Sequence, residues 1–130
     1  GRQWATRRMA EGLYKTAGRL RDRGLPPLTL WDVSKKGGGK VSHHSSHRNG
    51  VDADLRLYGS PKQNAELIVA AVDSMPVRQF YLNASRIREV CPHIRRDHPS
   101  HARRLCGYHG SGALLREWKG HTEHIHVRID

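Results

Sequence analysis

Two stretches of the chain carry apolar residues at the spacing of an α-helix. In residues 6–23 these positions are Met9, Leu13, Ala17 and Leu20. In residues 60–75 they are Leu67, Ile68, Ala71 and Val72. Gly24 and two prolines end the first stretch, and Ser60 and Pro61 are favoured residues at the start of a helix. We therefore predict two helices, each with one buried face.

Apolar and polar residues alternate in two further stretches, residues 51–58 and 124–129, as expected of half-buried strands. Their apolar side chains would face the core. The polar face of the first strand carries Asp52, Asp54 and Arg56. The polar face of the second carries His124, His126 and Arg128. Shorter strands are predicted at residues 28–33 and 79–82.

These elements predict an α+β fold in which a small, mainly antiparallel sheet carries the chemistry and about two helices pack on its apolar face. A chain of 130 residues is long enough for one core, so we expect a single domain over residues 1–130. The glycine run at residues 37–39 predicts a loop. The basic, histidine-rich stretch of residues 85–112 is expected to be mostly loop or short helix.

The composition indicates an anionic partner, because the formal net charge is +11 and the pI is near 10.5. Nucleic acid, anionic lipid and a cell wall with carboxylates and phosphates all qualify. Aromatic residues make up only 6% of the chain and do not alternate with the basic ones, which argues against base stacking. We therefore expect no specific nucleic-acid partner. No apolar run is long enough to span a membrane, and we expect a monomer.

Two cysteines, Cys91 and Cys106, are too few for a disulfide framework and are not spaced as in a zinc knuckle. Two readings remain open. A single local disulfide would close a loop that contains three histidines and would indicate an oxidising compartment. If the cysteines are instead two free, buried thiols, there is no closed loop and no indication of the compartment.

Three residues have the chemistry of an open zinc site, namely His47, Asp54 and His126. Imidazole nitrogens and a carboxylate oxygen hold catalytic zinc through three ligands and leave the fourth position for water. Asp54 and His126 lie on the polar faces of two predicted strands, and His47 precedes Asp54 by seven positions in a loop. If the two strands are neighbours, the three ligands converge on one zinc ion.

At these residues the chain resembles the lysostaphin, D-alanyl-D-alanine peptidase and hedgehog-type zinc metallopeptidases. Their first motif, Ser-x-His-x-x-Gly-x-x-x-Asp, matches residues 45–54, and their His-x-His motif matches residues 124–126. Within that group the chain is most similar to the penicillin-insensitive murein endopeptidases, which also carry a histidine three positions before each motif histidine. His44 and His121 occupy those positions here.

The resemblance implies zinc-dependent hydrolysis of D-alanine-containing peptide cross-links in bacterial peptidoglycan, with peptidoglycan peptides as the partner. Zinc would lower the pKa of its bound water and polarise the peptide carbonyl. His124 is expected to serve as acid and base, and His121 to assist the proton transfer or stabilise the oxyanion. His44 and Asp52 are expected to orient a ligand or the substrate.

Several alternatives use the same residues. A D,D-carboxypeptidase or dipeptidase would share the zinc chemistry but needs a cationic group that closes one end of the groove. A binding module could keep zinc without catalysis, although it would not need spare imidazoles. A metal-dependent nuclease and a non-heme iron enzyme fit the ligand spacing less well.

Localisation follows from the substrate, since no targeting segment is visible. The chain begins at Gly1, which suggests a mature form or an excised catalytic domain. We expect it in the periplasm or secreted, or delivered to the cell wall by a phage or as a toxin.

Overall fold

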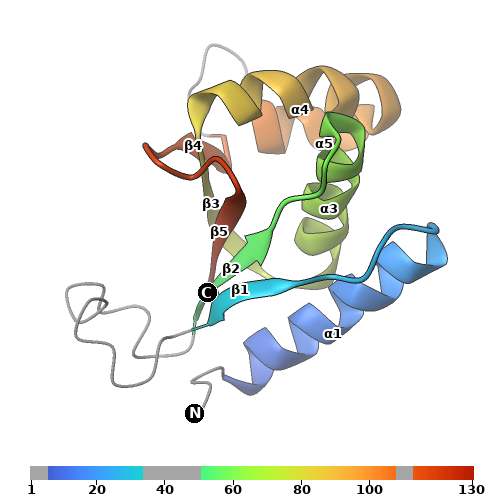
Figure 1. Cartoon of the computed structure of the whole chain (residues 1–130), viewed down its shortest axis with the longest axis vertical. Helices are drawn as coiled ribbons and strands as arrows, with labels where there is room; N and C mark the ends of the chain where they lie inside the picture. Colours follow the sequence, from blue (N-terminus) through green and yellow to red (C-terminus); the bar gives the residue numbers. More distant parts are fainter. Residues whose placement is uncertain (1–5, 34–50, 108–112) are drawn as a thin grey trace.

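The computed structural model describes residues 6–33, 51–107 and 113–130, which surround one five-stranded sheet (Figure 1). The helices among these residues are α1 (Arg7–Asp22), α3 (Pro61–Ser74), α4 (Ala84–Asp97) and α5 (Pro99–Cys106). The strands are β1 (Leu30–Val33), β2 (Asp52–Arg56), β3 (Val77–Leu82), β4 (Leu115–Glu117) and β5 (His124–Ile129). His43, His44 and His47 lie outside the described residues.

The sheet has the strand order β1-β2-β5-β3-β4, so the last strand in the sequence lies at its centre. β5 pairs antiparallel with β2 on one side and with β3 on the other, and β1 pairs antiparallel with β2. β4 pairs parallel with β3. The α+β prediction is confirmed, but the sheet is mixed rather than mainly antiparallel. The physical reason is that α4 and α5 form a helical crossover between β3 and β4, which a parallel pair requires.

Figure 1 shows α1, α3 and α4 gathered to one side of the strands. The sheet residues that face them include Ala53, Leu55, Phe80, Ile125 and Val127, all fully buried. The predicted helices at residues 6–23 and 60–75 are confirmed by α1 and α3, and Thr6 and Ser60 cap them through their side-chain oxygens. None of the described helices is long and apolar enough to cross a membrane.

α1 and α3 approach closely because Gly12 lacks a side chain at their contact. A Cβ atom added at Gly12 would lie 2.6 Å from Cβ of Met75, which follows the last turn of α3. That distance is well inside van der Waals contact. The glycine therefore sets how tightly the N-terminal helix closes over the core.

The prediction of loop or short helix for residues 85–112 is wrong for α4, a regular helix of 14 residues, whereas α5, with 8 residues, is a short helix as predicted. α4 buries Val90, Cys91 and Ile94, which lie on one helical face. Pro92 within the helix, together with its four arginines and His93, hid this spacing. β4 was not predicted either, since three residues are too few to show alternation.

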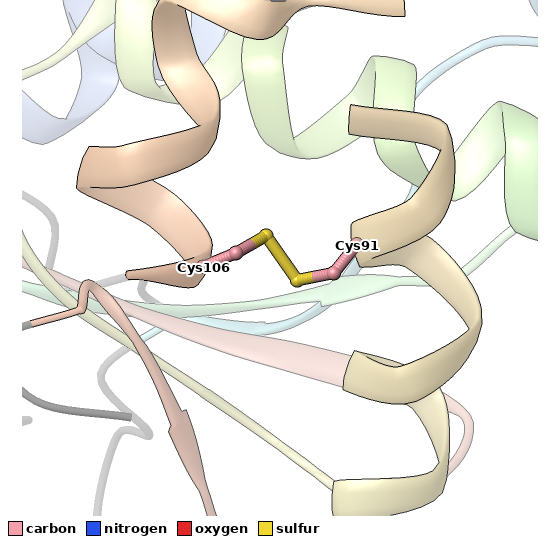
Figure 2. Close-up of a disulfide and its surroundings, with 2 residues drawn as sticks. All are labelled: Cys91 and Cys106. Carbon is pink, nitrogen blue, oxygen red and sulfur yellow. A yellow bond between two sulfur atoms is a disulfide. The ribbon is translucent and has the colours of Figure 1, made fainter. Parts of the chain in front are cut away.

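Cys91 and Cys106 form a disulfide, which decides between the two readings left open by the sequence. Figure 2 shows that the bond joins α4 to α5. Cys91 is buried and Cys106 is partly buried. The bond thus fastens the helical crossover that leads to β4, and such bonds persist in oxidising compartments.

Reduction of this disulfide is expected to lower the free energy of unfolding by about 3 kcal/mol, because the bond closes a loop of about 15 residues and restricts the unfolded chain. Urea unfolding with and without a reductant measures the difference. The variant Cys91→Ser/Cys106→Ser is the control and should no longer respond to the reductant. Equal stability of the oxidised and reduced wild type would contradict the prediction.

Candidate metal centre

The site lies on the face of the sheet that bears no described helix. The pairing register of the strands brings its residues together. Asp54 of β2 is paired with His126 of β5, and His126 is paired in turn with Tyr81 of β3. Directly paired residues place their side chains on the same face of a sheet. The condition set by the sequence is therefore met, since the strands that carry the candidate ligands Asp54 and His126 are neighbours.

His126 lies between two carboxylates. Its Nδ1 is 2.8 Å from Oδ1 of Asp54, and its Nε2 is 2.5 Å from Oδ1 of Asp52. Burial of the ring lowers the pKa of His126, but the hydrogen bonds to Asp52 and Asp54 outweigh burial and raise the pKa to about 9. In the metal-free protein at neutral pH both ring nitrogens thus carry protons and donate to these carboxylates.

Asp52 holds the ring of His126 in place. The residue is fully buried, and its Oδ1 also accepts a hydrogen bond from Nε of Arg128 at 3.1 Å. Asp52 thereby fixes the ring of His126 through Nε2 and leaves Nδ1 directed at Asp54. A carboxylate bound to one nitrogen of a histidine in this way is the usual support of a metal-ligating imidazole.

His121 and His124 bring two more imidazoles to the centre. The His121 ring lies 4.8 Å from that of His124 and 6.2 Å from that of His126, measured between ring centroids. Burial lowers the pKa of His121, and the neighbouring His124 lowers it further. His121 is therefore neutral at pH 7, which is the form that accepts a proton or binds a metal.

Asp54, His121 and His126 form a group that could hold a metal ion. One ligand atom from each lies within 4.8 Å of the other two. The predicted ligand set contains two of these residues, Asp54 and His126, whereas His121 was predicted to act in catalysis. His47 and His44 lie outside the described residues, so their predicted roles stay predictions.

Three aromatic side chains border this cluster, and the sequence reasoning missed all of them. Trp31 of β1 stacks on His124 with ring centroids 5.2 Å apart and an angle of 23° between the planes. Tyr81 meets the ring of His126 edge-on at 5.7 Å, and Trp118 meets that of His121 edge-on at 5.9 Å. In the sequence, the only indication of these contacts was that Trp118 lies three residues before His121.

This fold and these side chains define an α+β domain with a candidate metal centre of one carboxylate and two or more imidazoles. The chain belongs to the family of penicillin-insensitive murein endopeptidases, whose sequence profile matches residues 1–89. The resemblance drawn from the two motifs is confirmed at this level. The matched residues include the first motif and end before the His-x-His pair, and the broader grouping with lysostaphin and hedgehog-type enzymes stays a prediction.

A curated relative extends the similarity through the rest of the chain. The chain is 28% identical over 141 aligned residues to the penicillin-insensitive murein endopeptidase of Haemophilus influenzae. The alignment covers 93% of this chain but 49% of the relative. The chain therefore spans about half the length of that protein.

Replacement of Asp52 by alanine is expected to destabilise the metal-free protein by about 3 kcal/mol, because it removes the acceptor shared by His126 and Arg128 inside the sheet. Urea unfolding measures the change. Glu123→Gln is the matched control, since this exposed carboxylate precedes β5 and should change stability by less than about 0.5 kcal/mol. A similar small effect for Asp52→Ala would show that Asp52 does not anchor the site.

Proposed function

We propose that the protein is a zinc-dependent endopeptidase that hydrolyses D-alanine-containing peptide cross-links in bacterial peptidoglycan. Family membership supports the reaction class, and the pairing of Asp54 with His126 carries the proposal for a metal. The same proposal assigns the chain to the periplasm or the cell exterior. The disulfide fits that location.

The donor atoms of the site fit a zinc ion. Asp54 would supply a carboxylate oxygen and His126 would supply Nδ1, and these two atoms lie 2.8 Å apart. His47 is proposed as the third ligand, since it stands in the first motif seven positions before Asp54. A bound zinc ion would activate a water molecule and polarise the substrate carbonyl. Binding must displace the Nδ1 proton of His126, so metal affinity should rise with pH up to about 9.

His124 is proposed as the group that moves the proton during hydrolysis. Its ring faces the same side of β5 as His126 and is held by stacking on Trp31. Arg56, paired with His124 across the strands, places its guanidinium 5.4 Å from the Trp31 ring centroid. Trp31 thus contacts both residues and limits the rotation of the imidazole.

His121 is proposed to assist His124, because their rings are neighbours and its lowered pKa leaves it able to accept a proton. The same properties suit a metal ligand, and its ligand atom lies within reach of Asp54 and His126. The third ligand therefore has two candidates: His121, from the geometry of the described residues, and His47, from the sequence motif. His44 is proposed to orient one of these groups or the substrate.

Hydrolysis of purified, cross-linked peptidoglycan tests the proposed function. The zinc-loaded protein is expected to convert cross-linked dimers into monomers, identified by mass. Removal of zinc with a chelator, or the substitution His126→Ala, should lower the rate at least about a thousandfold, because the metal supplies both the nucleophile and the electrophile. His93→Ala, on the outer side of α4, is the matched histidine control and should retain activity.

Release of free D-alanine instead of monomers would replace the endopeptidase proposal with a D,D-carboxypeptidase. A zinc-loaded protein that binds peptidoglycan and releases neither product would support a binding module. Cleavage of DNA or RNA by the same sample, with an unchanged cell wall, would favour a metal-dependent nuclease.

The third ligand can be identified by zinc affinity measured with a competing chelator. His47→Ala is expected to weaken zinc binding more than about a hundredfold. Loss of a residue that only supports a ligand weakens metal binding by about ten- to a hundredfold. His121→Ala should weaken it less than about tenfold while lowering kcat. His43→Ala serves as the control, since this neighbour of the motif has no proposed role. The reverse result, with zinc lost in His121→Ala and kept in His47→Ala, would assign the ligand to His121.

A further inference from the structure

A hollow of about 670 Å³ lies where β4, an edge strand of the sheet, meets the first turns of α4 and the end of α5. Ile87, Leu114 and Leu115 give it an apolar lining. Cys106, the last residue of α5, lines it as well. The described residues of the candidate metal centre do not line this hollow, so it is a separate feature of the fold.

Cys106 is the more accessible half of the disulfide. It is partly exposed, whereas Cys91 has only 4% of its surface exposed and belongs to the core. Figure 2 shows the bond between the two cysteines in the space between α4 and α5. A thiol reacts with a disulfide at the sulfur that it can reach. A reagent held in the hollow would therefore meet Cys106 rather than Cys91.

The hollow carries an excess of positive charge. Arg78, Arg88 and Arg116 line it, against the single carboxylate of Glu117 among its described residues. All three arginines are exposed, and within the described part of the chain none of them pairs with a carboxylate. A cleft lined by charge of one sign raises the rate of encounter with an oppositely charged molecule by about tenfold or more.

We propose that the hollow is a thiol-exchange site, at which a small thiol that also carries an anionic group reacts with the disulfide of Cys91 and Cys106. Arginines alone would suit any anion, and an accessible disulfide alone would suit any thiol. Their presence in one hollow selects a molecule that carries both groups.

The exchange is a single displacement at sulfur. The arginines hold the anionic group, and the thiolate of the ligand attacks Sγ of Cys106. The bond between the two cysteine sulfurs breaks as a mixed disulfide forms between the ligand and Cys106. Cys91 leaves with the electron pair as a thiolate and takes a proton from water. The sulfur of the ligand is thereby oxidised and that of Cys91 is reduced.

The modification would act on the helical crossover that precedes β4. It opens the covalent link between α4 and α5, so the end of α5 is then held only by non-covalent contacts. One of these joins α5 to the chain just before β4, since N of Leu114 donates to the carbonyl oxygen of Arg104 at 2.9 Å. Trp118, the residue after β4, contacts His121 in the metal centre. The exchange itself does not depend on the proposed function.

The test uses three thiols that share a two-carbon chain and differ in charge, namely 2-mercaptoethanesulfonate, 2-mercaptoethanol and cysteamine. Their rates of reaction with the folded protein are followed by mass. Each rate is divided by that of the same thiol with bis(2-hydroxyethyl) disulfide, which corrects for intrinsic reactivity. The anionic thiol is expected to react about tenfold faster than the neutral one, and the cationic thiol more slowly than both. Salt at about 1 M should remove most of this difference, because it screens the arginines.

Arg78→Gln/Arg88→Gln/Arg116→Gln should react with the three thiols at equal corrected rates. The charge-matched control is Arg7→Gln/Arg19→Gln/Arg21→Gln, which removes three exposed arginines from α1 and should keep the preference. Thermal unfolding checks that each variant is folded. Equal corrected rates in the wild type, which needs no variant, would overturn the proposal, and so would the same loss of preference in the control.

Iodoacetamide added during the reaction locates the sulfur that is attacked. Cys106 is expected to carry the added thiol and Cys91 the alkyl group, both identified by mass after digestion. The opposite assignment would contradict attack from the hollow. A rate that does not rise with thiol concentration would do the same, because the disulfide would then react only after the domain opens.

Discussion

The antiparallel pairing of β2 with β5 is the interaction on which the rest of the structure depends. Its register places Asp54 opposite His126 and Asp52 opposite Arg128. The alternate residues of both strands are buried against the helices, so a slip of one position would expose the core and bury the polar face. The hydrophobic core thus fixes the register, and the register fixes the site. No separate interaction is needed to bring the carboxylates and the imidazoles together.

Much of the fold could be predicted because local patterns agree with the tertiary structure. Helices α1 and α3 and strands β2 and β5 all lie where the spacing of apolar residues placed them. The sequence could not show the helical crossover, since α4 contains Pro92 and carries a dense positive charge on its outer face. The orientation of β4 depends on that crossover, which is why the mixed character of the sheet was missed. Such features are decided by packing far from the residues concerned.

In the site, too, features set by the local sequence pattern could be predicted, whereas contacts between distant residues could not. Asp54 and His126 could be assigned to polar faces from alternation alone, and their proximity followed once their strands were adjacent. The sequence predicted that Asp52 orients a ligand or the substrate, but not that it is buried and bound to Nε2 of His126. The stacking of Trp31 on His124 could not be anticipated, because it joins residues 93 positions apart, 124 − 31 = 93. The proximity of a ligand atom of His121 to those of Asp54 and His126, within 4.8 Å, was not anticipated either.

The central place of β5 in the sheet also governs the order in which the molecule can assemble. β1 and β2 can pair early during synthesis, but in the described sheet β3 and β4 are joined to that pair only through β5, which lies between β2 and β3. A chain that lacks β5 would hold two separate pieces of sheet, with Asp52 and Asp54 on one and Tyr81 on the other. Such long-range closure is slow compared with the formation of a helix. The centre therefore comes into existence in the same event that completes the core, and a partly folded chain cannot carry a working site.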